Sequence, residues 1–206
     1  MVALSSERWQ QLMLAWSLPE SVKTLTVLQQ HYAEAHRAYH TAEHILACLH
    51  HFDAVQDHLQ MPEVVEMAIW FHDVIYNPTQ SDNEALSAAM AAQFLVSSSH
   101  DWRESVIQMI LATQSHQAPV DSDMAFMLDI DLSILGADAE VFQPYEADIR
   151  FEYQFVPKAL YQQKRREILE QFLARPRLYF TDYFQQKLGV RAEENLAWAV
   201  AFNSAV

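Results

Sequence analysis

The segment 62-PEVVEMAIWFHDVIY-76 places His72 and Asp73 between the apolar runs "MAIWF" and "VIY". Pro62 suits the first position of a helix, where its missing N–H is not needed. Apolar residues then recur at helical spacing, which predicts a helix that ends near Asp73. A charge buried among such neighbours needs a partner, and a cation is one good partner.

Helical periodicity continues along most of the chain, and no segment shows a convincing strand-like alternation. Only two glycines occur, which disfavours a β-rich protein with many tight turns. The sequence therefore predicts an all-α protein. We expect helices over residues 7–16, from Pro19 through Leu28, and over 41–59, 62–73, 84–96, 101–111, 124–136, 138–151, 157–174 and 191–204.

Local signals suggest how several of these helices begin and end. Asp82 is expected to be an N-cap. The pair His100-Asp101 follows three serines, and an N-cap role for Asp101 accounts for it without any chemistry. Gly136 is expected to be a C-cap, and Gly189 to mark a break between helices.

The composition excludes several classes of function. The 206 residues carry 27 acidic and 13 basic side chains, a net charge of −14 that would repel duplex nucleic acid. Neither a Rossmann nor a P-loop glycine motif is present. The single cysteine suggests a reducing compartment, and no apolar run approaches the roughly 20 residues that cross a bilayer. We expect a soluble cytoplasmic protein without a membrane partner.

Two further stretches carry groups that bind metals. In 37-RAYHTAEHI-45, His40 and His44 are four residues apart, so they share a face if the helix begins by His40. In 128-LDIDLSILG-136, Asp129 and Asp131 lie about 200° apart on a helix, so at most one faces a shared ion comfortably. Imidazole and carboxylate ligands suit Mn, Fe, Co, Ni or Zn.

Together these elements resemble the HD superfamily of metal-dependent phosphohydrolases. The resemblance rests on His44, the His72-Asp73 pair and Asp131. The motifs "R-x-Y-H-x-x-x-H-I", "F-H-D-x-x-Y", "D-N-E-x-x-S-A", "T-x-x-H" and "L-D-I-D-L-S-I-L-G" are similar to one uncharacterised branch of that superfamily. The resemblance implies a single HD-like helical domain over 1–206, with a metal-site core at about 36–135 and a C-terminal helical extension at about 138–206.

The same resemblance implies a metal site. His44, His72, Asp73 and Asp131 would bind the ion, with Asp129 as an alternative ligand or as an acceptor that orients one. "Y-H-x-x-x-H" also resembles the cyclic-nucleotide phosphodiesterases, in which the first histidine, here His40, protonates the leaving oxygen. The chain lacks the glutamine motif with which those enzymes hold a purine, so their specificity is not implied.

Several other residues have two or more interpretations. Glu84 could orient the attacking water, or could simply complement the helix dipole. His116 could bind a second metal, contact phosphate, or lie in a loop. Arg37 and Arg150 could bind phosphate through paired donors, or could form ordinary salt bridges.

The expected function is hydrolysis of a small phosphate ester or nucleotide by metal-activated water, with one or two divalent ions, Mg included. A bound metal ion would locally offset the negative electrostatic field of the protein, so that a small anionic substrate could bind. Two alternatives remain open at this point: a di-iron oxygenase of the HD fold, and a non-catalytic ligand-sensing module with a structural metal. The sequence leaves the oligomeric state open, a homodimer included.

Overall fold

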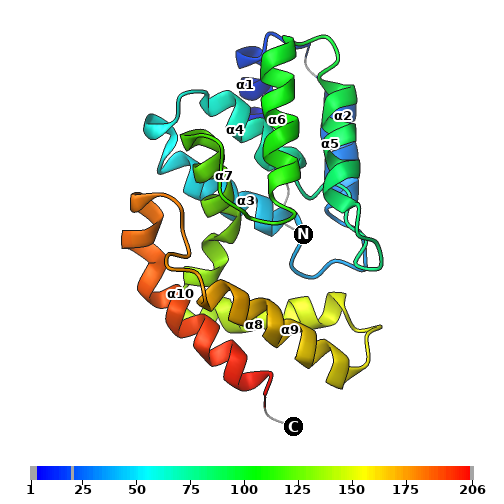
Figure 1. Ribbon diagram of the computed structural model, residues 1–206. Helices are drawn as coiled ribbons and strands as arrows, with labels where there is room; N and C mark the ends of the chain where they lie inside the picture. Colours follow the sequence, from blue (N-terminus) through cyan, green and yellow to red (C-terminus); the bar gives the residue numbers. More distant parts are fainter. Residues whose placement is uncertain (1–3, 20, 205–206) are drawn as a thin grey trace. The chain divides into compact units, whose positions relative to one another are not determined.

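The computed structural model describes residues 4–19 and 21–204 (Figure 1). Every regular element within these ranges is a helix, which confirms the all-α prediction. No helix among them combines the length and the apolar character needed to span a bilayer. The elements are α1 (Ser6–Ala15), α2 (Val22–His31), α3 (Ala42–Asp53), η1 (Gln56–His58), α4 (Pro62–Phe71), α5 (Asn83–Phe94), α6 (His100–Ala112), α7 (Ser122–Asp131), η2 (Leu132–Gly136), α8 (Ala139–Glu152), α9 (Lys158–Leu173) and α10 (Asp182–Phe202).

The chain divides into two compact units, with the boundary between Ile130 and Asp131. In unit 1, α4 is the central helix: it contacts α1, α3, α5 and α6, and seven of its ten residues are buried. Trp70 of α4 packs edge-on against Trp9 of α1, with ring centroids 5.1 Å apart. The apolar segment that ends in His72 and Asp73 therefore lies in the core of this unit.

In unit 2, α10 packs against η2, α8 and α9. Gly136 ends η2 where α10 comes close: a Cβ added at Gly136 would lie 2.5 Å from Cβ of Leu188 and 2.9 Å from the hydroxyl of Tyr179. The C-cap residue of η2 is Ala137 and the φ of Gly136 is not positive, so the prediction that Gly136 is a C-cap is wrong. The glycine is required by the close approach of a neighbouring helix, which a sequence pattern does not reveal.

The predicted break at Gly189 is also wrong, because this glycine lies inside α10, which begins at Asp182. A glycine within a helix costs roughly 0.5–1 kcal/mol relative to alanine. Here the missing Cβ leaves room for the Gln185 side chain. That side chain reaches Tyr179 and accepts a hydrogen bond from its backbone N–H at 3.1 Å.

Three other helix boundaries differ from the prediction. The helix expected over 124–136 is divided, because α7 ends at Asp131 and the 3-10 helix η2 follows it. Helix α2 begins at Val22 rather than at Pro19, because the Ser21 hydroxyl caps it and accepts from the Thr24 N–H at 3.2 Å. Helix α3 ends at Asp53 rather than at Leu59. The chain then turns at Val55, whose side chain is fully buried, and a short 3-10 helix follows.

Of the two predicted aspartate N-caps, Asp82 occupies the predicted position and Asp101 does not. Asp101 lies within the first turn of α6, and Ser99 occupies the N-cap position. Asp82 does occupy the N-cap position of α5, but its side chain makes no capping hydrogen bond. The sequence signal located both helix starts to within two residues, but not the groups that stabilise them.

Candidate metal centre

Two buried imidazoles face each other in unit 1. His44 lies in the first turn of α3, and His72 follows α4 directly as its C-cap residue. Their residues are 5% and 1% exposed, and their Nε2 atoms are 3.1 Å apart. The two histidines are 28 residues apart in sequence, so the packing of α3 against α4 brings them together.

The ring of His72 has a defined orientation and tautomer. Its Nδ1 lies 2.9 Å from the backbone carbonyl of Ile69. A carbonyl only accepts, so Nδ1 carries the proton and the Nε2 lone pair of the neutral ring points toward His44. Metal-binding histidines are commonly held in this way, with the distal ring nitrogen bonded to a carbonyl.

Asp73 adds an oxygen to this pair of nitrogens. Its Oδ2 lies 3.2 Å from Nε2 of His72 and 3.5 Å from Nε2 of His44. Atoms that bind one ion at about 2.0–2.2 Å lie roughly 2.9–3.5 Å apart at octahedral or tetrahedral angles. The triangle formed by the three atoms therefore has the size of a shared coordination shell.

Cys48 and Asp131 form a second group with the same two histidines, and Asp73 is not a member of it. His44, Cys48, His72 and Asp131 each offer one ligand atom, and these four atoms all lie within 4.8 Å of one another, so the group could hold a metal ion. Asp131 is the last residue of α7 and the first residue of unit 2.

Cys48 was missed by the sequence reasoning, although a signal was present. It lies four residues after His44 on α3, and its Sγ is 3.7 Å from Nε2 of His44. Residues i and i+4 share a helix face, so the spacing alone brings the thiol to the side of the imidazole.

Asp129 lies two residues before Asp131 on α7 and is fully buried. It does not belong to the group of four ligand atoms. Two residues correspond to about 200° of helix rotation, so the two carboxylates leave the helix on nearly opposite sides.

Comparison of the chain with protein-family models, with curated proteins and with solved structures found no match. The resemblance to the HD superfamily therefore rests on the motif residues themselves.

His40 lies beside the metal-binding group but outside α3. The helix begins at Ala42, and the Thr41 hydroxyl accepts from the Glu43 N–H at 3.3 Å, so the prediction that His40 and His44 share a helix face is wrong. Their ring centroids are nevertheless 6.0 Å apart. The half-buried His40 ring stacks on Tyr76, with centroids 4.1 Å apart.

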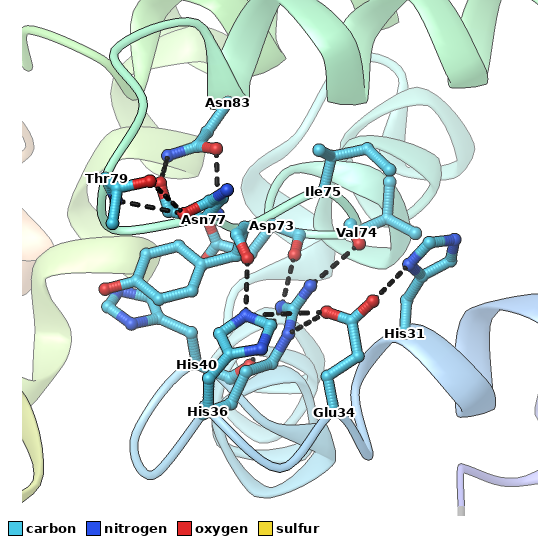
Figure 2. Close-up of polar contacts among 12 residues, drawn as sticks. His31, Glu34, His36, His40, Asp73, Val74, Ile75, Asn77, Thr79 and Asn83 are labelled. Atoms are coloured by element: carbon cyan, nitrogen blue, oxygen red, sulfur yellow. Dashed lines mark hydrogen bonds and ion pairs between the residues drawn. The ribbon is translucent and has the colours of Figure 1, made fainter. Parts of the chain in front are cut away.

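Arg37 ties the His40 segment to the residues that follow α4. Its side chain is fully buried, and Nη1 donates to the backbone carbonyls of His40 at 3.0 Å and Asp73 at 2.7 Å. Nη2 donates to the carbonyl of Val74 at 2.9 Å, and Nε donates to Glu34 at 3.0 Å. Figure 2 labels the four residues that accept these bonds, Glu34, His40, Asp73 and Val74. The guanidinium thus bonds to protein acceptors and positions the two segments.

Glu34 extends the network toward two more histidines. The ring of Tyr32 lies against the guanidinium of Arg37. The Glu34 carboxylate is 2.9 Å from Nδ1 of His31 and 3.7 Å from Nε2 of His36 (Figure 2). Burial, with the nearby negative charge of Asp73, raises the pKa of Tyr32 well above its ordinary value. Its hydroxyl therefore stays protonated and donates to the Trp70 carbonyl at 3.0 Å.

Glu84 lies in the first turn of α5 and is half-buried. The loop that leads to α5 is closed by two asparagines: Asn77 N–H donates to the Asn83 side chain at 2.9 Å, and the Asn83 amide donates back to the Asn77 carbonyl at 3.1 Å (Figure 2). Glu84 thus follows a well-defined turn, but it is not a member of the ligand group.

His116 is not a member of the ligand group either, and Arg150 belongs to α8 of unit 2. His116 follows α6 with a left-handed φ of 47°, and its N–H donates to the Ala112 carbonyl at 3.0 Å. Arg150 lies in the last turn of α8 in unit 2, where Nη1 donates to the carbonyls of Tyr153 and Val156.

Proposed function

We propose that this chain is a cytoplasmic metal-dependent phosphohydrolase of the HD type that acts on a small phosphate ester or nucleotide. The observation that carries the proposal is the triangle of His44 Nε2, His72 Nε2 and Asp73 Oδ2, with sides of 3.1, 3.2 and 3.5 Å. The carbonyl of Ile69 supports it by directing the His72 lone pair into the triangle.

The donor set favours a transition metal over Mg²⁺. Two imidazoles, carboxylates and the thiol of Cys48 suit Zn, Fe or Co, whereas Mg²⁺ prefers an all-oxygen octahedral environment. Mn and Ni fit the imidazole and carboxylate groups. A bound divalent ion would act as a Lewis acid that polarises a phosphoryl oxygen and lowers the pKa of a water molecule.

The protein residues have separate roles in this proposal. Asp73 and Asp131 offset the charge of the ion, and His40, half-buried beside the ligands, donates a proton to the leaving oxygen. Arg37 holds the backbone of both His40 and Asp73, and so sets the spacing between proton donor and ligands. The half-exposed His40 favours catalysis over a purely structural or sensing metal, because a structural site needs no proton donor.

Elemental analysis tests the proposal first. Protein purified without oxygen or chelator is expected to contain about one equivalent of a transition metal, and to hydrolyse at least one member of a phosphoester panel when loaded with that metal. Chelated protein is the control and should be inactive until the metal is restored. Protein that never binds a transition metal above trace level, or hydrolysis that persists after full chelation, would contradict it.

The two α7 aspartates provide a matched pair of variants. Asp131→Ala is expected to lose at least tenfold in metal affinity, because it removes a carboxylate from the ligand group. Asp129→Ala should have a much smaller effect on metal affinity, because Asp129 lies outside that group. The measurement is metal content after dialysis against graded chelator concentrations. Equal metal retention by Asp131→Ala and wild type would show that Asp131 is not a ligand.

A further inference from the structure

Unit 2 contains a cavity of about 390 Å³. It is lined by residues of α8, α9 and α10, including Glu146, Arg150, Tyr161, Trp198 and Phe202, all of them within unit 2. The volume lies within the range of about 300–1,000 Å³ that is typical of small-molecule sites. None of these residues takes part in the metal-binding group.

Arg150 presents an unused edge of its guanidinium. Nη1 is anchored by the carbonyls of Tyr153 at 2.8 Å and Val156 at 3.1 Å, and the guanidinium carbon lies 4.7 Å from the ring centre of Tyr161. Among the described residues no acceptor bonds to Nε or Nη2, and neither atom is buried without a partner, so both are accessible. The Nε and Nη2 donors form a planar fork that matches a carboxylate.

Tyr161 contributes a hydroxyl that lacks a partner. The residue is only 7% exposed, and its hydroxyl oxygen is buried without a hydrogen bond in the described part of the chain. Burial raises the pKa of Tyr161 to about 12, so the hydroxyl is a donor at neutral pH. A buried hydroxyl without a partner is costly, and an oxygen atom of a ligand would satisfy it.

The balance of charge favours an anion. Glu146 is the one acid in the lining, and it forms a buried ion pair with Arg165. Arg150 and Lys158 also line the cavity, and neither has a carboxylate partner among residues 4–19 and 21–204. The cavity therefore has a positive lining in a chain whose net charge is −14.

An aromatic pair forms an apolar part of the lining. Trp198 and Phe202 lie one turn apart on α10 and stack with ring centroids 5.1 Å apart and planes 12° apart. They remain 36% and 59% exposed, respectively. A ligand with a flat apolar group would be stabilised by covering these two rings, because water would leave both the rings and the ligand.

From these contacts we propose that the cavity of unit 2 binds a small organic carboxylate with an apolar, preferably aromatic, body. The carboxylate pairs with the Nε and Nη2 edge of Arg150 and accepts from the Tyr161 hydroxyl, while the body covers Trp198 and Phe202. The proposal does not depend on the metal site or on hydrolysis.

Calorimetric titration of the full chain with 2-naphthoate tests the proposal. Saturable binding is expected for 2-naphthoate, with much weaker binding of acetate, which lacks the body, and of 2-naphthalenemethanol, which lacks the charge. Arg150→Gln should weaken 2-naphthoate binding by about 10–100-fold, the range for a charge-assisted bond. Arg191→Gln is the matched control, because Arg191 lies outside the cavity and pairs with Asp138 on the surface.

Tyr161→Phe keeps the test decisive if Arg150→Gln fails to fold. It removes only an oxygen that has no partner, so its melting temperature should equal or exceed that of wild type, while 2-naphthoate binding weakens about 3–10-fold. Phe202→Ser should also weaken binding, whereas Phe155→Ser should not, because Phe155 is almost as exposed as Phe202 but lies outside the cavity.

Three outcomes would overturn the proposal. The first is the absence of saturable 2-naphthoate binding to wild type. The second is unchanged affinity in folded Arg150→Gln or in Tyr161→Phe. The third is tighter binding of 2-naphthylphosphonate than of 2-naphthoate, which would assign the cavity to organic phosphates instead.

Discussion

His40→Ala is expected to retain its metal and its melting temperature, and to hydrolyse a phosphoester with a poor leaving group about 10²–10⁴-fold more slowly than wild type. The side chain lies in the turn before α3, stacked on Tyr76. Arg37 bonds to the backbone carbonyl of His40, which alanine preserves. The substitution therefore removes an imidazole and leaves the positioning contact in place.

The rate loss should depend on the leaving group. An aryl phosphate departs with little protonation, so His40→Ala should lose much less activity on it than on an alkyl phosphate. His50→Ala is the matched control, since His50 is exposed on the neighbouring helix α3. Equal losses on both substrates, or a His40→Ala protein without metal, would place His40 among the ligands or the substrate-binding residues.

His44→Ala is expected to lose its metal and about 3–5 kcal/mol of unfolding free energy, the usual cost of removing one partner from a buried charged group. His44 is 5% exposed and lies between His72 Nε2 at 3.1 Å and Asp73 Oδ2 at 3.5 Å. Without it, the carboxylates of Asp73 and Asp131 would be poorly compensated, and the binding energy of the ion would no longer contribute to folding.

Denaturant unfolding with and without chelator separates these contributions. Wild type should lose stability on chelation, whereas His44→Ala should not respond. His50→Ala again serves as the control and should behave as wild type. A His44→Ala protein that retains a full equivalent of metal would show that the paired imidazoles form a hydrogen-bonded network rather than a coordination shell.

The buried helix α4 was predictable from the sequence for a local reason. Pro62 begins it, apolar residues repeat at helical spacing, and seven of its ten residues are buried as expected. Cys48 was predictable in the same way, because its spacing of four from His44 is a local helical relation. The predicted ligand set nevertheless omitted Cys48, because a single cysteine was interpreted only as a sign of a reducing compartment.

Other features depended on contacts that local patterns do not encode. The start of α3 is set by the Thr41 cap, so His40 approaches His44 from a turn and not from the same helix. Gly136 and Gly189 looked like helix ends, but each makes room for a side chain, Leu188 in one case and Gln185 in the other.

The sequence by itself determined the helical class and the residues that carry imidazole, thiol and carboxylate groups, because hydrophobic periodicity and residue chemistry are local properties. Only the tertiary structure decided how Arg37 is used. Two of its acceptors are the backbone carbonyls of Asp73 and Val74, 36 and 37 residues further along the chain. Every residue has a backbone carbonyl, so no sequence pattern distinguishes these acceptors until the fold brings them to the guanidinium.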